Sequence, residues 1–253
     1  MRSYDFIKQY KFGTIKSISY LTQFPSYTSN FRLYKSVSEQ YNDQSILDSV
    51  KRLVPEKVLQ LIPEDQTLKP LLHWFKHDFM KWMPKGPHCL KCNNGQMSIQ
   101  LVDDNSGTIR KTEIHVCNVC GSKQIFQRYD SILRIAETRI GRCSEWSILF
   151  GAITNSLPIQ TRIVHDYLDH CWNESLINNK WIHIDSTLDY PISFDHPHCY
   201  EQNWGKNYEY VLAFSANSVE DVTTRYTQQW PRVQKRRGRK DKMEKLREIY
   251  YRT

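Results

Sequence analysis

The chain has no long uninterrupted run of apolar residues, and this lack limits the classes of protein to which it can belong. Its 253 residues are 40% hydrophobic, and none of its segments reaches the roughly 18 consecutive apolar residues of a transmembrane helix. The first thirty residues hold no continuous apolar run either, so we expect no signal peptide. The length suits one large domain or two small ones, and either is large enough to bury a core.

Most of the chain also lacks an excess of either charge. The formal net charge is +8, but residues 232–253 carry ten Lys or Arg against three acidic residues, a local charge of +7. The preceding 231 residues are therefore close to +1. A body without a basic surplus argues against nucleic-acid binding as its main activity, and we assign the basicity to a C-terminal tail.

The cysteines do not form the pattern of a secreted, disulfide-stapled domain. There are seven, an odd number, and four of them lie in the C-x-x-C pairs Cys89/Cys92 and Cys117/Cys120. Such pairs favour a metal site and a reducing compartment, the cytoplasm or the nucleus. The 24 residues between the pairs read as strand, turn and strand. Four thiolates on such a hairpin predict a tetrahedral, structural Zn²⁺ site with no open position for catalysis.

A helix is predicted to begin near Cys143, after the flexible Gly141, and to stop before Pro158. Cys143 then lies in the first turn, where free backbone N–H groups and the helix dipole favour a thiolate. By position alone, Cys143 is either a nucleophile or a small buried cysteine at a helix end. Five apolar residues recur at helical spacing: Trp146, Leu149, Phe150, Ile153 and Leu157.

A β-hairpin after this helix supplies two further groups. Its arms, 170–177 and 180–185, flank Asn178-Asn179 as a two-residue turn. This register places His170 and Asp185 one diagonal step apart on the same sheet face, roughly 7–8 Å at the backbone and within side-chain reach. An imidazole oriented by a carboxylate is the base that a cysteine nucleophile needs. The alternative is a surface hairpin with incidental polar residues.

These residues carry a resemblance to a known family. The segments 141–146 (GRCSEW), 169–172 (DHCW) and 181–185 (WIHID) resemble the transglutaminase-like superfamily, and most closely its cytoplasmic peptide:N-glycanases. The family usually has Gly where this chain has Ser144, and Val where it has Cys171. Further matching motifs extend the resemblance from about Leu71 to Trp230: residues 74–82, the paired cysteines, 203–206, 210–214 and 221–226.

The resemblance implies a hydrolase, a peptide-N4-(N-acetyl-beta-glucosaminyl)asparagine amidase. Such an enzyme cleaves the amide between N-acetylglucosamine and an asparagine side chain of misfolded N-glycoproteins, and converts Asn to Asp. Cys143 would attack the amide carbonyl, His170 would transfer the proton, and Asp185 would orient His170. The best candidates for sugar contacts are Trp172, Glu174 and Trp204.

The resemblance also implies partners and a cellular role. The expected substrate is an unfolded N-glycoprotein, and the expected protein partner is a ubiquitin-shuttle or proteasome adaptor. This role belongs to glycoprotein quality control and ER-associated degradation in the cytoplasm, with the nucleus as a second compartment. We expect no membrane and no nucleic-acid partner. Two other functions stay open: a non-catalytic binding module like those of DNA-damage-recognition proteins, and a cysteine protease or acyl transferase.

The order of elements predicts an α+β fold, a transglutaminase-like (papain-like) cysteine-hydrolase core with a zinc-binding hairpin insertion. We divide the chain into an irregular segment 1–43, a catalytic core 44–231 that includes the zinc-binding subdomain 84–128, and a basic tail 232–253. Within the core we expect two short helices between 45 and 62, helices over 71–83 and 129–140, and strands over 161–167, 208–214 and 219–226.

Overall fold

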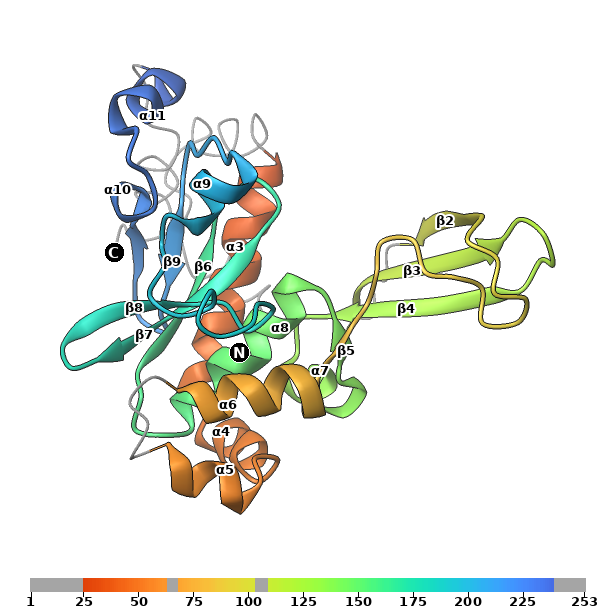
Figure 1. The fold of residues 1–253 in the computed structure, drawn as a ribbon, viewed down its shortest axis with the longest axis horizontal. Coiled ribbons are helices and arrows are strands. Elements are labelled where there is room, and N and C mark those ends of the chain that lie inside the picture. Colours follow the sequence, from red (N-terminus) through yellow and green to blue (C-terminus); the bar gives the residue numbers. More distant parts are fainter. Residues whose placement is uncertain (1–24, 63–67, 103–108, 239–253) are drawn as a thin grey trace, which may run out of the picture.

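The computed structural model describes residues 25–62, 68–102 and 109–238, and the body is built on one five-stranded sheet (Figure 1). Each strand runs antiparallel to its neighbour, in the order β10-β9-β6-β7-β8. Helices and antiparallel strands in this arrangement confirm the predicted α+β class. The five strands are β6 (Thr161–His165), β7 (Cys171–Ile177), β8 (Lys180–Ile184), β9 (Leu212–Phe214) and β10 (Val219–Asp221).

Helix α8 (Cys143–Asn155) packs on one face of this sheet, as predicted. Every side chain from Ser144 to Thr154 is buried, because the helix lies between the sheet and the helices near the N-terminus. Burying one Leu or Ile contributes about 1.5–3 kcal/mol, so this helix is the centre of the core. It ends three residues before Pro158, whose ring cannot continue a helix.

Strand alternation divides the sheet between two apolar clusters. Ile163 and Cys171 face the α8 side, whereas their neighbours Val164 and Trp172 face the other side. Two short helices, α9 (Cys199–Trp204) and α10 (Thr223–Tyr226), supply aromatic rings to this second cluster. Neither helix was predicted; strand β10 stops at Asp221, so the predicted strand over 219–226 is too long. Strands β6 and β9 are likewise shorter than 161–167 and 208–214.

The hairpin of β7 and β8 has the predicted turn and register. Asn178 and Asn179 have φ values of 50° and 61°, which is the left-handed pair that a tight hairpin turn of this kind requires. Asn tolerates this conformation better than most residues. Glu174 pairs with His183, which places the residues just beyond the strand ends, His170 and Asp185, at the same edge of the sheet.

The prediction that 1–43 is irregular is wrong for the part that the structure describes. Helix α3 occupies Pro25–Glu39 and continues into the 3-10 turn η1 (Gln40–Asn42). Phe31, Tyr34 and Val37 recur every third residue and are buried against the body, a signal hidden among many polar residues. Residues 1–24 lie outside the described ranges.

The two short helices predicted between 45 and 62 are confirmed. Helix α4 (Gln44–Lys51) begins at Asp43, whose carboxylate accepts the backbone N–H of Ser45 at 2.9 Å. Helix α5 (Glu56–Leu61) follows Pro55, and the helix predicted over 129–140 is the shorter α7 (Ile132–Thr138). None of the helices in the described ranges has the length and apolar character needed to span a bilayer.

The helix predicted over 71–83 ends early. It comprises α6 (Lys69–Trp74) and the π-helical turn η2 (Phe75–Phe79), after which the chain becomes extended. Strand β1 (Lys81–Trp82) then pairs in parallel with β5 (Ile140–Gly141). Trp82 is 50% exposed, so it leaves the buried stripe to which its spacing seemed to assign it. The pairing with β5 is a long-range interaction that helical spacing does not report.

A three-stranded sheet projects from the body as an arm (Figure 1). Its strands are β2 (Met97–Val102), β3 (Ile109–Cys117) and β4 (Lys123–Tyr129), paired in that order. The first two are the predicted strands between the cysteine pairs, and β4 is an addition. The predicted turn between them lies outside the described residues.

The domain boundary predicted at Pro231 is wrong. Helix α11 (Trp230–Arg237) packs on the body, with Val233 fully buried. The guanidinium of Arg237 pairs with the Asp221 carboxylate at 2.7 Å and donates to the Thr223 hydroxyl at 2.7 Å. The start of the basic segment is therefore part of the core; residues 239–253 lie outside the described ranges.

These contacts predict the effect of replacing Arg237. Arg237→Ala removes charge-assisted hydrogen bonds from a partly buried site and should lower the free energy of unfolding by about 1.5–3 kcal/mol. Arg232→Ala, at an exposed position on the same helix, should change it by less than about 0.5 kcal/mol. Urea denaturation of both variants measures the difference. Equal stability of the two variants would restore the boundary at Pro231.

Candidate active site

Cys143 is the first residue of α8, and Arg142 is the N-cap of this helix. The Glu145 carboxylate turns back to accept the backbone N–H of Arg142 at 3.0 Å. A Cβ on Gly141 would lie 2.3 Å from the Cβ of Glu145, so this close approach requires glycine. Cys143 is partly exposed beside the free N–H groups of the first helical turn.

His170 and Asp185 meet at the edge of the β7–β8 hairpin. His170 Nε2 lies 2.8 Å from Asp185 Oδ2. Asp185 is fully buried, and its other oxygen accepts hydrogen bonds from the Thr187 backbone N–H at 2.8 Å and hydroxyl at 2.7 Å. The structure therefore brings together the imidazole and the carboxylate that the hairpin register predicted.

Tyr200, on α9, is a third group at this pair that sequence reasoning missed. Its hydroxyl donates a hydrogen bond to Asp185 Oδ2, the oxygen that also faces His170. The Tyr200 ring meets the His170 ring edge-on at 5.0 Å between centroids. Tyr200 thus fixes both the carboxylate and the plane of the imidazole. It lies in a segment with no regular apolar spacing, so no local pattern indicates it.

Asp166 holds the backbone that precedes His170. One oxygen of its buried carboxylate accepts the backbone N–H groups of Leu168, Asp169 and His170, at 2.9, 3.0 and 3.0 Å. The other oxygen pairs with Lys206 at 2.8 Å. The loop that presents His170 is therefore fixed by a charged side chain that is itself neutralised. Asp166 was also missed, because loop-forming Asp residues are common and carry no specific signal.

The charges around this pair move three pKa values in the directions that a thiolate nucleophile needs. Burial alone would lower the pKa of His170, but the adjacent Asp185 carboxylate and Cys143 raise it to about 10. A hydrogen bond from the Cys171 thiol, followed by the contact with His170, holds the pKa of Cys143 well below its usual value despite burial. Burial would raise the pKa of Asp185, but His170 and the hydrogen bonds lower it. These shifts favour a thiolate–imidazolium pair of Cys143 and His170 near neutral pH.

A cleft of about 1280 Å³ opens beside Cys143 and His170. Its lining includes residues of α3, β1 and α9. Trp82 and Trp204, which are 50% and 56% exposed, both line the cleft and present ring surface to it. Of these two tryptophans, only Trp204 was predicted as a substrate contact.

The other two predicted sugar contacts need correction. Trp172 and Glu174 are fully buried on the sheet face that α9 and α10 cover, and neither lines the cleft. The Trp172 indole donates to the Tyr226 hydroxyl at 2.8 Å, and Glu174 pairs with Arg162 at 2.7 Å. Strand alternation placed them correctly on the face of His170. Helices α9 and α10 cover that face at both positions, so Trp172 and Glu174 serve packing rather than ligand contact.

Ser144, which follows the candidate nucleophile, turns away from Cys143 toward the arm. Its hydroxyl accepts hydrogen bonds from Arg128 at 2.7 Å and Arg110 at 3.2 Å. The same two guanidinium groups pair with the buried Glu145 carboxylate at 2.9 Å. A serine at this position therefore joins an existing charge cluster, and the cluster ties β3 and β4 to the first turn of α8.

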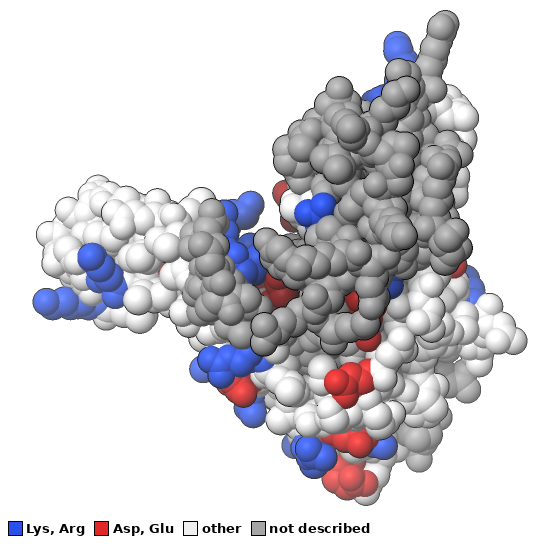
Figure 2. Space-filling view, turned by 180° about the vertical axis from the view of Figure 1, so that it is seen from behind, with Lys and Arg blue, Asp and Glu red and all other residues white. Residues whose placement is uncertain are grey.

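A second ion pair joins the arm to the nucleophile segment. Arg142, directly before Cys143, binds both oxygens of Glu113 on β3, at 2.6 and 2.7 Å. In Figure 2, basic and acidic side chains lie next to one another where the arm meets the body. The charge cluster at Glu145 and the Arg142–Glu113 pair thus both hold the arm against the N-terminus of α8.

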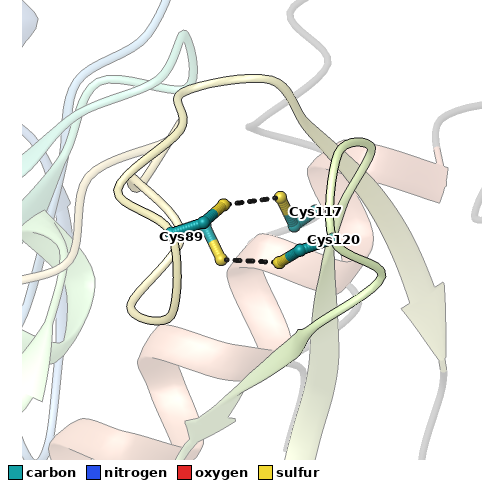
Figure 3. Close-up of side chains that lie close together, drawn as sticks. Cys89, Cys117 and Cys120 are labelled. Atoms are coloured by element: carbon teal, nitrogen blue, oxygen red, sulfur yellow. Dashed lines mark hydrogen bonds between the residues drawn. The ribbon is translucent and has the colours of Figure 1, made fainter.

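The four predicted metal ligands lie together at the arm. Cys89 and Cys92 come from the loop before β2, and Cys117 and Cys120 from the end of β3 and the turn after it (Figure 3). Their sulfur atoms all lie within 4.8 Å of one another, with two pairs at 3.6 Å. A metal bound by four thiolates at about 2.3 Å needs sulfurs about 3.8 Å apart, so this group fits one metal ion.

The lowered pKa of Cys143 predicts how the thiol responds to pH. An ordinary thiol, with a pKa of about 8.5, loses nearly tenfold in alkylation rate per pH unit below that value. Cys143 should react with iodoacetamide at a nearly constant rate between about pH 6 and 8. In Asp185→Asn, the pKa of His170 falls and that of Cys143 rises, so the rate at pH 6 should drop roughly tenfold.

Mass spectrometry of the alkylated peptides measures these rates. Cys199 serves as an internal control, because burial and the nearby Asp185 charge raise the pKa of its thiol to about 11. A steep loss of Cys143 reactivity below pH 8 in the unmodified chain would contradict the thiolate–imidazolium pair.

Comparison with known proteins shows which families and proteins this chain is similar to. Residues 98–186 match the profile of the transglutaminase-like superfamily, and residues 169–253 match that of the Rad4 transglutaminase-like domain. The fold is similar to a solved structure described as "Role of Beta-hairpin motifs in the DNA duplex opening by the Rad4/XPC nucleotide excision repair complex". That match has a TM-score of 0.53 and 16% identity, and covers 92% of this chain and 54% of that chain. At this identity it supports the fold alone.

Several relatives are peptide-N(4)-(N-acetyl-beta-glucosaminyl)asparagine amidases. The chain is 32% identical to the Caenorhabditis elegans protein over 204 residues, which are 76% of this chain and 33% of that protein. It is 36% identical to the Mus musculus protein over 200 residues, 76% of this chain and 30% of that protein. Identity to the Saccharomyces cerevisiae protein is 39% over 175 residues, 64% and 46% of the two chains.

The chain thus spans 30–46% of the length of these three relatives. The transglutaminase-like match over residues 98–186 contains Cys143, His170 and Asp185, and the described fold has the helix-on-sheet core in which they meet. Residues 98–186 therefore match a transglutaminase-like domain, and the chain is similar to the peptide-N(4)-(N-acetyl-beta-glucosaminyl)asparagine amidases.

Proposed function

We propose that this chain is a deglycosylating amidase that cleaves the amide between N-acetylglucosamine and an asparagine side chain. The observation that carries the proposal is the arrangement of Cys143, His170 and Asp185 at one end of an open cleft, in a chain similar to amidases of this specificity. The product on the protein is aspartate, because hydrolysis replaces the amide nitrogen with oxygen.

The first chemical step uses the preformed ion pair. The Cys143 thiolate attacks the side-chain carbonyl carbon of asparagine, and a tetrahedral intermediate forms. Free backbone N–H groups at the start of α8 stabilise the oxyanion. The His170 imidazolium then donates its proton to the leaving nitrogen, which releases the glycosylamine and leaves a thioester on Cys143.

The second step regenerates the enzyme. His170, now neutral, takes a proton from water, and the hydroxide attacks the thioester carbonyl. The Cys143 thiolate leaves, aspartic acid is released, and His170 is again an imidazolium. Asp185 stays ionised throughout, because its four hydrogen-bond donors hold its pKa low, and it keeps the imidazole in the productive orientation.

Cleft shape supports a sugar-bearing substrate. Trp82 and Trp204 offer exposed aromatic faces on the cleft wall, and such faces pack against the C–H surfaces of sugar rings. A cleft of about 1280 Å³ has room for the first sugar residue and a short extended peptide. An extended peptide is available only in an unfolded glycoprotein, so we propose misfolded N-glycoproteins as the substrate.

The wider role follows from the same proposal. An enzyme that acts on misfolded glycoproteins fits glycoprotein quality control and ER-associated degradation in the cytoplasm. A ubiquitin-shuttle or proteasome adaptor is the protein partner that the family resemblance implies. These assignments rest on resemblance rather than on any contact in the fold.

One other function has a specific observation in its favour. Similarity to the Rad4 fold and to the Rad4 domain profile is what a non-catalytic binding module would also give. A binding module needs no polarised thiolate, whereas Cys143 lies beside a histidine that a buried carboxylate keeps protonated. The geometry therefore favours the enzyme.

Four thiolates satisfy a tetrahedral metal completely, so we propose a structural Zn²⁺ in the arm rather than a catalytic one. Elemental analysis should find one zinc per chain. Cys117→Ser should lower the zinc content and the melting temperature, since the binding free energy of a structural zinc is folding free energy. The matched control is Cys199→Ser, at a buried cysteine outside the arm, which should keep its zinc. A fully folded Cys117→Ser variant without metal would contradict a structural role.

The activity itself is tested on a denatured N-glycoprotein. The chain should release the intact glycan and convert the acceptor Asn to Asp, and Cys143→Ala should lower the rate by about 10³-fold or more. Arg232→Ala, far from the cleft, should retain full activity. Cleavage of the peptide backbone would instead indicate a protease. Tight binding with no product at all would favour the binding module.

A further inference from the structure

A second thiol lies beside the candidate nucleophile. Cys171 is the first residue of β7, directly after His170. Its side chain is fully buried under the first turn of α8. Ser147 contacts both cysteine residues. Its Oγ lies 2.7 Å from the Cys143 carbonyl oxygen, 3.0 Å from the Cys171 carbonyl oxygen and 3.6 Å from the Cys171 Sγ.

Cys143, His170 and Cys171 also line the same cleft. Each cysteine shifts the pKa of the other: the Cys171 thiol lowers the pKa of Cys143, while burial and then Cys143 raise the pKa of Cys171. Cys171 is thus held by Ser147 beneath the first turn of α8, in the wall of the cleft that Cys143 also lines. The described cysteines form no disulfide, so both thiols are available.

We propose that Cys143 and Cys171 form an oxidisable thiol pair, in which Cys171 closes a reversible disulfide on Cys143 after a peroxide has oxidised the nucleophile. This site of modification does not depend on the proposed amidase activity. Its reagent is hydrogen peroxide or an organic hydroperoxide.

The first step is oxidation of Cys143. Its thiolate attacks one oxygen of the peroxide, the O–O bond breaks, and Cys143 becomes a sulfenic acid. The leaving hydroxide takes a proton from the His170 imidazolium and departs as water. Cys143 reacts first because it is partly exposed to the cleft, whereas Cys171 has no exposed surface.

The second step closes the pair. The Cys171 sulfur attacks the Cys143 sulfur, the S–OH bond breaks, and the hydroxide combines with the Cys171 proton to form a second water. Burial and the negative charge of Cys143 both raise the pKa of Cys171. That charge is absent in the neutral sulfenic acid, so this attack becomes easier after the first step. A thiol reductant restores both cysteines. With Val at this position, the sulfenic acid has no neighbouring thiol and is open to irreversible oxidation.

Tryptic mapping tests this proposal without reference to catalysis. Cleavage after Arg142, Arg162 and Lys180 places Cys143 in peptide 143–162 and Cys171 in peptide 163–180. After brief treatment of the full chain with hydrogen peroxide, at a small molar excess, these two peptides should appear cross-linked. Reduction with dithiothreitol should return most of both peptides as free thiols, because a thiol reductant reverses a disulfide.

The matched variants are Cys171→Val, which removes the thiol but keeps a small apolar side chain, and Cys199→Val at a buried cysteine outside the pair. Cys199→Val should form the cross-link like the unmodified chain. Cys171→Val should lose it and accumulate Cys143 sulfinic acid at least several-fold faster. Equal sulfinic acid formation in the unmodified chain and Cys171→Val, with no cross-linked peptides, would overturn the proposal, as would a cross-link to a different cysteine.

Discussion

The interaction on which the site depends is the hydrogen bond between the buried Asp185 carboxylate and the His170 imidazole. A carboxylate in the protein interior needs strong donors, and Asp185 obtains them from His170, Tyr200 and Thr187. Burial alone would disfavour the negative charge of Asp185, but these donors stabilise it. That charge keeps His170 protonated, and the His170 imidazolium in turn stabilises the Cys143 thiolate. The remaining elements position these groups: the hairpin sets their register, α8 presents the sulfur, and the arm is clamped to the start of α8.

The part of the site that depends on local geometry could be predicted from the sequence. A tight turn at Asn178-Asn179 determines which residues pair across the hairpin, and hence brings His170 to Asp185. The limits of α8 follow from apolar spacing and Pro158. The four clustered cysteines follow from the spacing of two short pairs. In each case the determining residues lie close together in the sequence.

What could not be predicted depends on packing between distant segments. Trp172 and Glu174 lie on the correct face of the strand, but α9 and α10 bury that face, and nothing local indicates the cover. Helix α3 looked irregular because its few buried aromatic residues are spread among polar ones. Tyr200 reaches Asp185 only because the loop after β8 returns over the hairpin.

The central claim is that the fold keeps His170 positively charged beside Cys143 at neutral pH. The most direct measurement is an NMR titration of the chain labelled with ¹⁵N in its histidine rings, with the His170 signals assigned by Asp185→Asn and Cys143→Ala variants. The structure predicts that His170 keeps both ring protons through about pH 8, far above the ordinary histidine pKa of about 6.5, and titrates only near 10. A His170 ring that is neutral at pH 8 would contradict the account.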